Sequence, residues 1–292
     1  MHINLPATGV AASINLRMIP HLRESIWFGH NVGMTCDHLN RPLALLWLLT
    51  TLCMATTGCV KFKHAMAVMP DGSGKVEITF GMGEAMLAHQ GDDGLNLIDL
   101  DELIAQEDRG FVAFTPPEVW AENGFTYQRI VGYFDDVDQI VIEGDENVDA
   151  AEPARTTFVY DADAGRLTIS RCLLQQVALE TESMVDADPS ERAVLGSMVN
   201  GLVIEESITV PGDIENAGPF EVGGRTAAAV IDEASILDEE EVVLDLWRNV
   251  AEVVIEFEPE DWLEAEQNDW AQELEAAKEA WAAVKASGSL TP

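Results

Sequence analysis

Basic residues are scarce in this chain of 292 residues. Lysine and arginine together number 16, against 52 aspartate and glutamate residues, and the formal net charge is -36. A field of this sign repels phosphate groups within the screening length. Nonspecific DNA or RNA binding is therefore excluded, and we expect no nucleic-acid partner. The apolar share of 47% is high enough to build a core, so the composition is that of a globular protein.

The sequence also lacks an apolar run of membrane-spanning length. Leu43 to Ala55 has thirteen residues without a charge, whereas a spanning helix needs about 20. Thirteen residues suit the apolar part of a secretory signal peptide, which takes about 7 to 15. Small residues follow and end in Gly58-Cys59. The segment predicts an export signal; the alternative is a buried core helix with an incidental Gly-Cys pair.

The residues up to Gly58-Cys59 resemble the lipobox of bacterial lipoproteins. The resemblance implies that a dedicated peptidase cuts between Gly58 and Cys59 once the cysteine thiol carries a diacylglycerol. Counted from Met34 the signal peptide has 25 residues, a normal length, whereas counted from the first residue it has 58. We predict that residues 34–58 are the signal peptide and residues 1–33 a mis-assigned upstream start; the alternative is an extended leader.

A lipid on Cys59 has consequences for location and partners. It predicts a mature chain anchored in the bacterial cell envelope, facing the periplasm or the exterior. The membrane is then a partner through the diacylglycerol-modified cysteine. The acidic body is expected to stand off anionic headgroups rather than lie flat on them.

Cysteine is too rare for a disulfide framework. The chain has four cysteines, of which Cys36 and Cys53 leave with the signal and Cys59 is acylated. The mature chain keeps Cys172 and forms no internal disulfide, although the compartment would permit one. We expect Cys172 to be a small buried hydrophobic residue.

Histidine is also scarce. After signal removal only His64 and His89 remain, too few for a histidine triad or a multi-histidine metal site. We expect both to be solvated. Gly81-Met82-Gly83 follows a strand but lacks the third glycine of a dinucleotide fingerprint. Asp161 to Gly165 is expected to be a turn rather than a calcium loop. The sequence therefore predicts no catalytic residue, metal site or cofactor.

Acidic clusters are expected by chance in so acidic a chain. One cluster has members close enough in sequence to gather a divalent cation weakly, and we interpret it as solvated surface. Its members are Asp135, Asp136, Asp138, Glu143, Asp145 and Glu146.

Period-two alternation and turn residues predict an antiparallel sheet built from hairpins. One hairpin covers residues 60–80 around the turn Pro70 to Gly74, and another covers residues 156–174 around Asp161 to Gly165. Further strands are expected at 110–114, 124–134, 137–142, 202–210, 224–231 and 253–257.

Three capping boxes predict helix starts, each an aspartate followed three residues later by a glutamate. The third helix is expected to bury Leu246 together with Trp247. With the strands, these helices give an α+β fold over residues 59–257. The capping pairs are Asp99 with Glu102, Asp188 with Glu191, and Asp238 with Glu241.

The last part of the chain, residues 258–286, predicts one long acidic amphipathic helix, followed by the tail 287–292. Apolar residues recur in alternating steps of four and three, as in a helical seam. This seam either docks on the sheet or pairs with another helix. Its positions are Leu263, Gln267, Trp270, Leu274, Ala277, Trp281 and Val284.

The order of the predicted features resembles the LppM-type domain of bacterial envelope lipoproteins. A lipidated cysteine is followed by a strand and the turn Pro70 to Gly74, and much later by ESITVPGDIENAG (206–218) before a strand at 225–231. That resemblance implies an α+β module with a suggested role in binding lipid or glycolipid. We therefore expect an envelope lipoprotein with a non-enzymatic role, either structural or in binding lipid or another envelope component. The alternatives are an envelope hydrolase that uses carboxylates or a divalent cation, and a module that binds a protein partner through the C-terminal helix.

Overall fold

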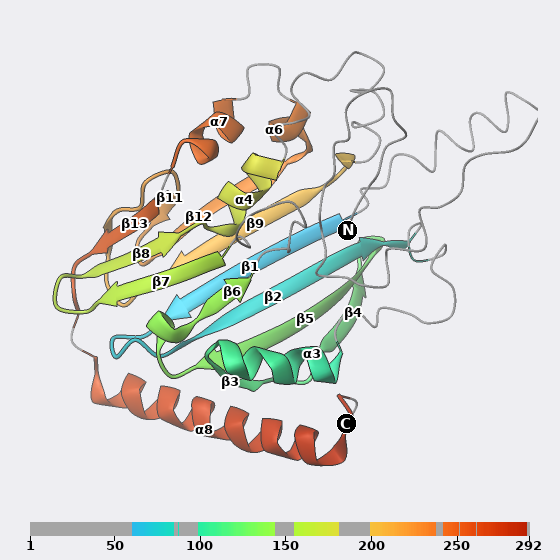
Figure 1. Ribbon diagram of the computed structural model, residues 1–292, viewed down its shortest axis with the longest axis vertical. Coiled ribbons are helices and arrows are strands. Elements are labelled where there is room, and N and C mark those ends of the chain that lie inside the picture. The colour runs from blue at the N-terminus through green and yellow to red at the C-terminus, as the bar shows by residue number, and fades with distance from the viewer. Residues whose placement is uncertain are drawn as a thin grey trace, which may run out of the picture.

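The computed structural model combines two β-sheets with helices at their ends and sides, which confirms the α+β class (Figure 1). The predicted signal peptide, Cys59, His89 and the capping pairs at Asp188 and Asp238 lie outside the residues that the structure describes. The described residues are 60–84, 87, 99–143, 155–180, 199–237, 242–250, 252–260 and 262–290.

The larger sheet has eight strands in the order β11-β12-β9-β1-β2-β5-β3, with β4 also paired to β5. The first strand of the chain is therefore central. Its pairing with β9 is parallel, which the expected antiparallel sheet did not include, while the other pairs are antiparallel. The strands are β1 (Val60–Val68), β2 (Gly74–Gly83), β3 (Phe111–Phe114), β4 (Glu118–Glu122), β5 (Phe125–Phe134), β9 (Val203–Thr209), β11 (Glu221–Gly223) and β12 (Thr226–Asp232).

The smaller sheet is antiparallel, in the order β10-β13-β8-β7-β6. One of its faces is buried and the other is solvated, as the alternation predicted. The expected strand 137–142 is largely a 3-10 turn, η3 (Val137–Gln139), because the Asp136 carboxylate accepts the Asp138 N–H and bends the chain. The strands are β6 (Val141–Glu143), β7 (Arg155–Asp161), β8 (Arg166–Ser170), β10 (Ile214–Asn216) and β13 (Glu252–Phe257).

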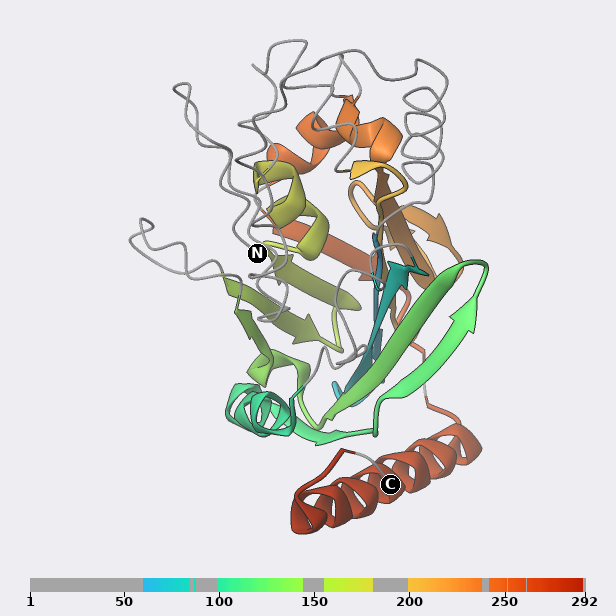
Figure 2. The ribbon, with the colours of Figure 1, turned by 90° about the vertical axis from the view of Figure 1, so that its right-hand side faces the viewer.

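A single core joins the two sheets. The inner face of the larger sheet contributes Met66, Phe134 and Ile208, and the smaller sheet contributes Leu167 and Ile255, all at most 2% exposed. Figure 2 shows the two sheets inclined to each other. Three short helices lie at one end of this core, α4 (Leu173–Glu180), α6 (Glu233–Leu237) and α7 (Val242–Arg248).

The short helices follow their sequence signals in part. Helix α3 (Leu100–Ala105) is capped by Asp99 as predicted, continues as η2 (Gln106–Arg109), and ends at Gly110. Helix α7 buries Leu244 beside Trp247 and leaves Leu246 52% exposed, so the prediction that Leu246 is buried was wrong. Trp247 packs edge-on against Phe220, which sets the rotation of the helix.

The long C-terminal helix, α8 (Glu264–Ser287), packs along the edge strand β3 (Figure 1). It begins six residues later than expected, because the Glu258 N–H bonds to the Asp213 carbonyl and keeps the chain extended there. Of the predicted seam, Trp270, Ala277 and Trp281 are buried, whereas Leu263 is 65% exposed. The seam therefore docks on the sheet of its own chain.

Polar contacts fix α8 at both ends. Trp270 Nε1 donates to Ser73 Oγ at 2.9 Å, and Trp281 Nε1 donates to Glu107 Oε1 at 2.6 Å. Lys285 Nζ donates to the same Glu107 oxygen at 2.6 Å. Burial alone would raise the pKa of Glu107, but the hydrogen bonds from Lys285 and Trp281, with the Lys285 charge, hold that pKa below its usual value. The Glu107 carboxylate therefore stays charged beside Trp281 and Lys285 of α8.

Candidate functional site

The candidate site is the end of the larger sheet where β1 begins. Val60 is the first residue of β1 and follows Cys59 directly in the sequence. We call this the anchor end. Across it, Val60 pairs with Met82, and Lys61 pairs with Val203. The predicted lipidation and cleavage residues, Cys59 and Gly58, lie outside the described residues, but the strand that follows them has a fixed place in the middle of the sheet.

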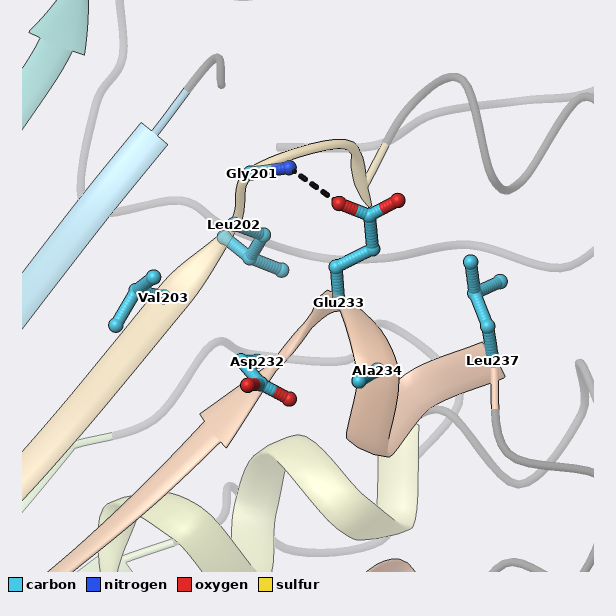
Figure 3. A pocket seen from close by; sticks show the side chains of 7 residues that line it. All are labelled: Gly201, Leu202, Val203, Asp232, Glu233, Ala234 and Leu237. Carbon is cyan, nitrogen blue, oxygen red and sulfur yellow. Dashed lines mark hydrogen bonds between the residues drawn. The ribbon is translucent and has the colours of Figure 1, made fainter. Parts of the chain in front are cut away.

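A shallow pocket of about 360 Å³ lies at the anchor end, between the start of β9 and the start of α6 (Figure 3). Val203 forms part of its wall and pairs with Lys61 on one side and with Asp232 on the other, so the pocket begins on the strand next to β1 and extends to the one beyond it. The wall combines apolar side chains with two carboxylates. Its residues are Gly201, Leu202, Val203, Asp232, Glu233, Ala234 and Leu237.

Both carboxylates of the pocket hold the backbone in place. Glu233 Oε2 accepts the Gly201 N–H at 2.8 Å, and Figure 3 shows the side chain turned toward that amide. Asp232 Oδ1 accepts the Ser235 N–H at 2.9 Å and the Ser235 hydroxyl at 2.8 Å. The backbone hydrogen bond from Ser235 is the main reason that the pKa of Asp232 lies below its usual value, and burial opposes it. These bonds hold Glu233 Oε2 and Asp232 Oδ1 in place and shape the rim of the pocket.

A buried polar cluster lies on the inner face of the same sheet. His64 on β1 and Glu206 on the neighbouring strand β9 are paired in register and are 7% and 3% exposed. His64 Nδ1 lies 3.5 Å from Glu206 Oε1. The prediction that His64 is solvated was therefore wrong. The reason is its phase, because His64 follows Phe62 and precedes Met66 on the inward side of β1.

Glu206 also caps the first turn of α4. Its carboxylate oxygens accept the Leu174 N–H at 3.1 Å and the Leu173 N–H at 3.4 Å, where the helix leaves amides without internal partners. The Cys172 thiol beside them is fully buried, as predicted. Burial, followed by the Glu206 charge, raises the pKa of Cys172 well above its usual value. A buried, protonated thiol is a poor nucleophile, so the cluster joins the sheet to α4 and supplies no attacking group.

Replacing Glu206 with glutamine is expected to lower the free energy of unfolding by about 1 to 3 kcal/mol, because an uncharged amide oxygen is a weaker acceptor and the NH2 group cannot accept the α4 N–H that the second carboxylate oxygen accepts. Urea unfolding followed by circular dichroism measures the change. Glu205→Gln is the matched control: the neighbouring side chain points outward and pairs with Lys63 Nζ at 2.9 Å, with 36% and 44% of the two side chains exposed. We expect a change below about 0.5 kcal/mol there, and equal losses in the two variants would contradict the assignment.

The acidic cluster near residue 135 is divided among separate structural tasks. Asp135 pairs with Lys278 on α8, Asp136 caps η3, and Asp138 accepts the Tyr160 N–H at 2.7 Å. Within the described ranges, no group of three or more His, Cys, Asp or Glu side chains is placed to hold a metal ion. Asp145 and Glu146 lie outside those ranges. Among the described residues, no helix is both long and apolar enough to cross a membrane.

Comparison with known proteins gives only a faint structural likeness. No known protein family matches the chain, and no curated protein matches it. Among solved structures, the chain is similar to the NMR structure of the folded domain of the Mycobacterium tuberculosis LppM protein, with 10% sequence identity and a TM-score of 0.31. The match covers 70% of this chain and 94% of that chain.

Proposed function

We propose that this chain is an envelope lipoprotein, held to a membrane by a diacylglycerol on Cys59, with a binding or structural role rather than an enzymatic one. The observation that carries the proposal is the junction between the lipobox-like segment and the fold. The apolar segment Leu43 to Ala55 ends just before Gly58-Cys59, and the central strand of the larger sheet starts at the next residue, Val60. A cut between Gly58 and Cys59 would therefore release the folded domain with its anchor attached and no linker between them.

The anchor end supports a binding role. It carries the shallow pocket, whose apolar wall residues are Val203 on the strand next to β1, Leu202 just before it, and Leu237 on α6. A ligand that enters this pocket would lie close to the membrane surface. Apolar walls favour the hydrocarbon part of such a ligand, while Asp232 and Glu233 disfavour an anionic headgroup at the rim.

The test is intact-mass analysis of the native protein extracted from membranes with detergent. We expect a mature chain that starts at Cys59 and carries the added mass of the acyl chains. Lipid extraction of the same purified protein, followed by mass spectrometry, reports whether a lipid also occupies the fold. A soluble chain that retains residues 34–58, without acyl mass, would overturn the proposed anchor and location together.

The two alternative functions have less support from the geometry. A carboxylate-dependent hydrolase would need free acids in a cleft, whereas Asp232 and Glu233 already accept backbone hydrogen bonds. A partner module built on α8 would need an exposed seam, whereas Trp270 and Trp281 are 6% and 1% exposed against this chain's own sheet. The envelope lipoprotein is therefore the function that the residues support best.

A further inference from the structure

The hairpin formed by β4 and β5 carries an aromatic group on the outer face of the larger sheet. The Trp120 and Tyr127 rings are stacked with centroids 5.1 Å apart and 15° between their planes, and Phe125 lies 5.9 Å from Tyr127. Lys61 Nζ lies 4.5 Å from the centroid of the Phe125 ring. We call these four residues the aromatic patch; Phe125 is 8% exposed and forms its buried base, while Trp120 and Tyr127 form its surface. Trp120 is 37% exposed, whereas Trp247, Trp270 and Trp281 are each at most 6% exposed.

The register places the aromatic patch at the anchor end. Lys61, Gly81, Tyr127 and Trp120 form one continuous row across β1, β2, β5 and β4. Neighbouring strands lie about 4.8 Å apart, so Trp120 is about 14 Å from Lys61 within the sheet. The row starts at the residue two positions after Cys59. Figure 1 shows β1 beginning at the same end of the sheet as the β4–β5 turn.

The tip of the hairpin reaches past the start of β1. Val60 shares its row with Met82 and Thr126, and the chain continues beyond that row to the turn at Asn123-Gly124. At about 3.4 Å per residue, the turn lies about 7 Å beyond Val60, on the side where the acyl chains would be attached. Figure 2 shows the hairpin projecting from the sheet. An anchor on Cys59 would therefore bring the tip and the aromatic patch to the level of the lipid headgroups.

We propose that the aromatic patch of the β4–β5 hairpin inserts into the interfacial layer of the bilayer that holds the Cys59 anchor, and so fixes the orientation of the domain on the membrane. The inference rests on the proposed function. Trp and Tyr rings with a polar tip partition to this layer, and the Lys61 ammonium matches the headgroup phosphates. The lipid chain supplies most of the binding energy, so the two accessible rings, Trp120 and Tyr127, with the Lys61 cation suffice for orientation.

A second copy of the chain fits this surface less well than a membrane does. A stable dimer buries about 800 Å² on each partner, more than a few rings provide. The edge strand β4 also presents Glu118 and Glu122, which are exposed and would face their own copies in edge-to-edge pairing. Glu84 and Glu122 near the tip are exposed, and their negative charge opposes any attraction of the hairpin to anionic headgroups. We therefore expect the hairpin to bind zwitterionic lipid as well as anionic lipid.

The experiment uses the full, acylated protein in phosphatidylcholine vesicles. One set of vesicles contains lipids brominated near the headgroup, at carbons ~6 and ~7, and the other contains lipids brominated deep in the chain, at carbons ~11 and ~12. The two depths are compared because interfacial rings lie at the headgroup level. Tryptophan fluorescence is compared between the wild type and Trp120→Phe, which keeps a ring stacked on Tyr127. The Trp120 fluorescence is the difference between the wild-type signal and the Trp120→Phe signal. We expect lipids brominated near the headgroup to quench this fluorescence at least about twofold, and lipids brominated deep in the chain to quench it less. Trp262→Phe, a substitution at a half-buried tryptophan on the connection into α8, is the matched control, and we expect the quenched signal to persist there.

The outcomes separate the two proposals. Acyl mass on the protein without quenching of the Trp120 signal would overturn the aromatic-patch inference and leave the lipoprotein proposal standing. Absence of acyl mass would overturn both. A cross-linked dimer through β4 that shields Trp120 from both brominated lipids would assign the surface to a second copy and reject the membrane.

Discussion

Replacing Cys59 with alanine is expected to abolish acylation and to leave the chain unprocessed, with residues 34–58 still attached. In the proposed function the diacylglycerol is attached to the Cys59 sulfur, and a lipobox-type peptidase would cut only after that modification. The acylated species should fall from nearly the whole population to none. Intact-mass analysis of wild type and variant, together with fractionation of the cells, measures both the acyl mass and the amino terminus.

Cys53→Ala is the matched control for this prediction. Cys53 lies in the apolar segment Leu43 to Ala55, six residues before Cys59. Its substitution removes a thiol and keeps the predicted cleavage site. We expect normal acylation and cleavage in this variant. Acyl mass on the Cys59→Ala chain, or a mature terminus upstream of Cys59 in the wild type, would refute the assignment of the anchor.

The second large effect is expected for Trp281→Ala, which removes the main contact between α8 and the sheet. The Trp281 ring is 1% exposed, meets the Phe114 ring edge-on with centroids 5.3 Å apart, and donates its N–H to Glu107. Removing a buried tryptophan costs about 3 to 5 kcal/mol, because transfer energy is lost and a cavity remains. We expect this loss in urea unfolding, together with faster hydrogen exchange of the α8 amides while the sheet amides keep their protection.

Leu263→Ala provides the contrast within the same predicted seam. Leu263 is 65% exposed and immediately precedes the first residue of α8. Its truncation removes little buried surface, so we expect a change below about 0.5 kcal/mol. If both substitutions cost the same, or if exchange in Trp281→Ala rises equally in the sheet and the helix, then α8 does not form a separately docked unit.

The sequence is a good guide wherever local chemistry decides the structure. The hairpin around Pro70 to Gly74 and the turn at Asp161 to Gly165 were predicted because aspartate and glycine set the turn and the flanking residues alternate. The fully exposed strand β4 was missed, although Asn123-Gly124 is a strong hairpin signal between it and β5. Both turn residues have positive φ angles there, as a tight hairpin of this type requires.

Contacts between distant segments explain most of the remaining differences. Nothing in the alternation of β1 specifies β9 as its parallel neighbour, because a strand pattern states which face is buried and not which strand lies alongside. The buried His64 did leave a signal, since it and Glu206 each share the phase of apolar neighbours. Polar residues in phase with a buried face are the cue that predicts such a pair. At the candidate site, the lipobox resemblance indicates the anchor, but only the register shows that the aromatic patch lies beside it.

The parallel pairing of β1 with β9 also bears on how such a chain is made and exported. The first strand finds one neighbour in β2 soon after synthesis, but its other edge stays open until Val203 to Thr209 arrive. Pairings between segments so far apart along the chain form slowly. If the chain is exported amino end first, as the proposed function requires, its larger sheet can close only after Val203 to Thr209 have also crossed.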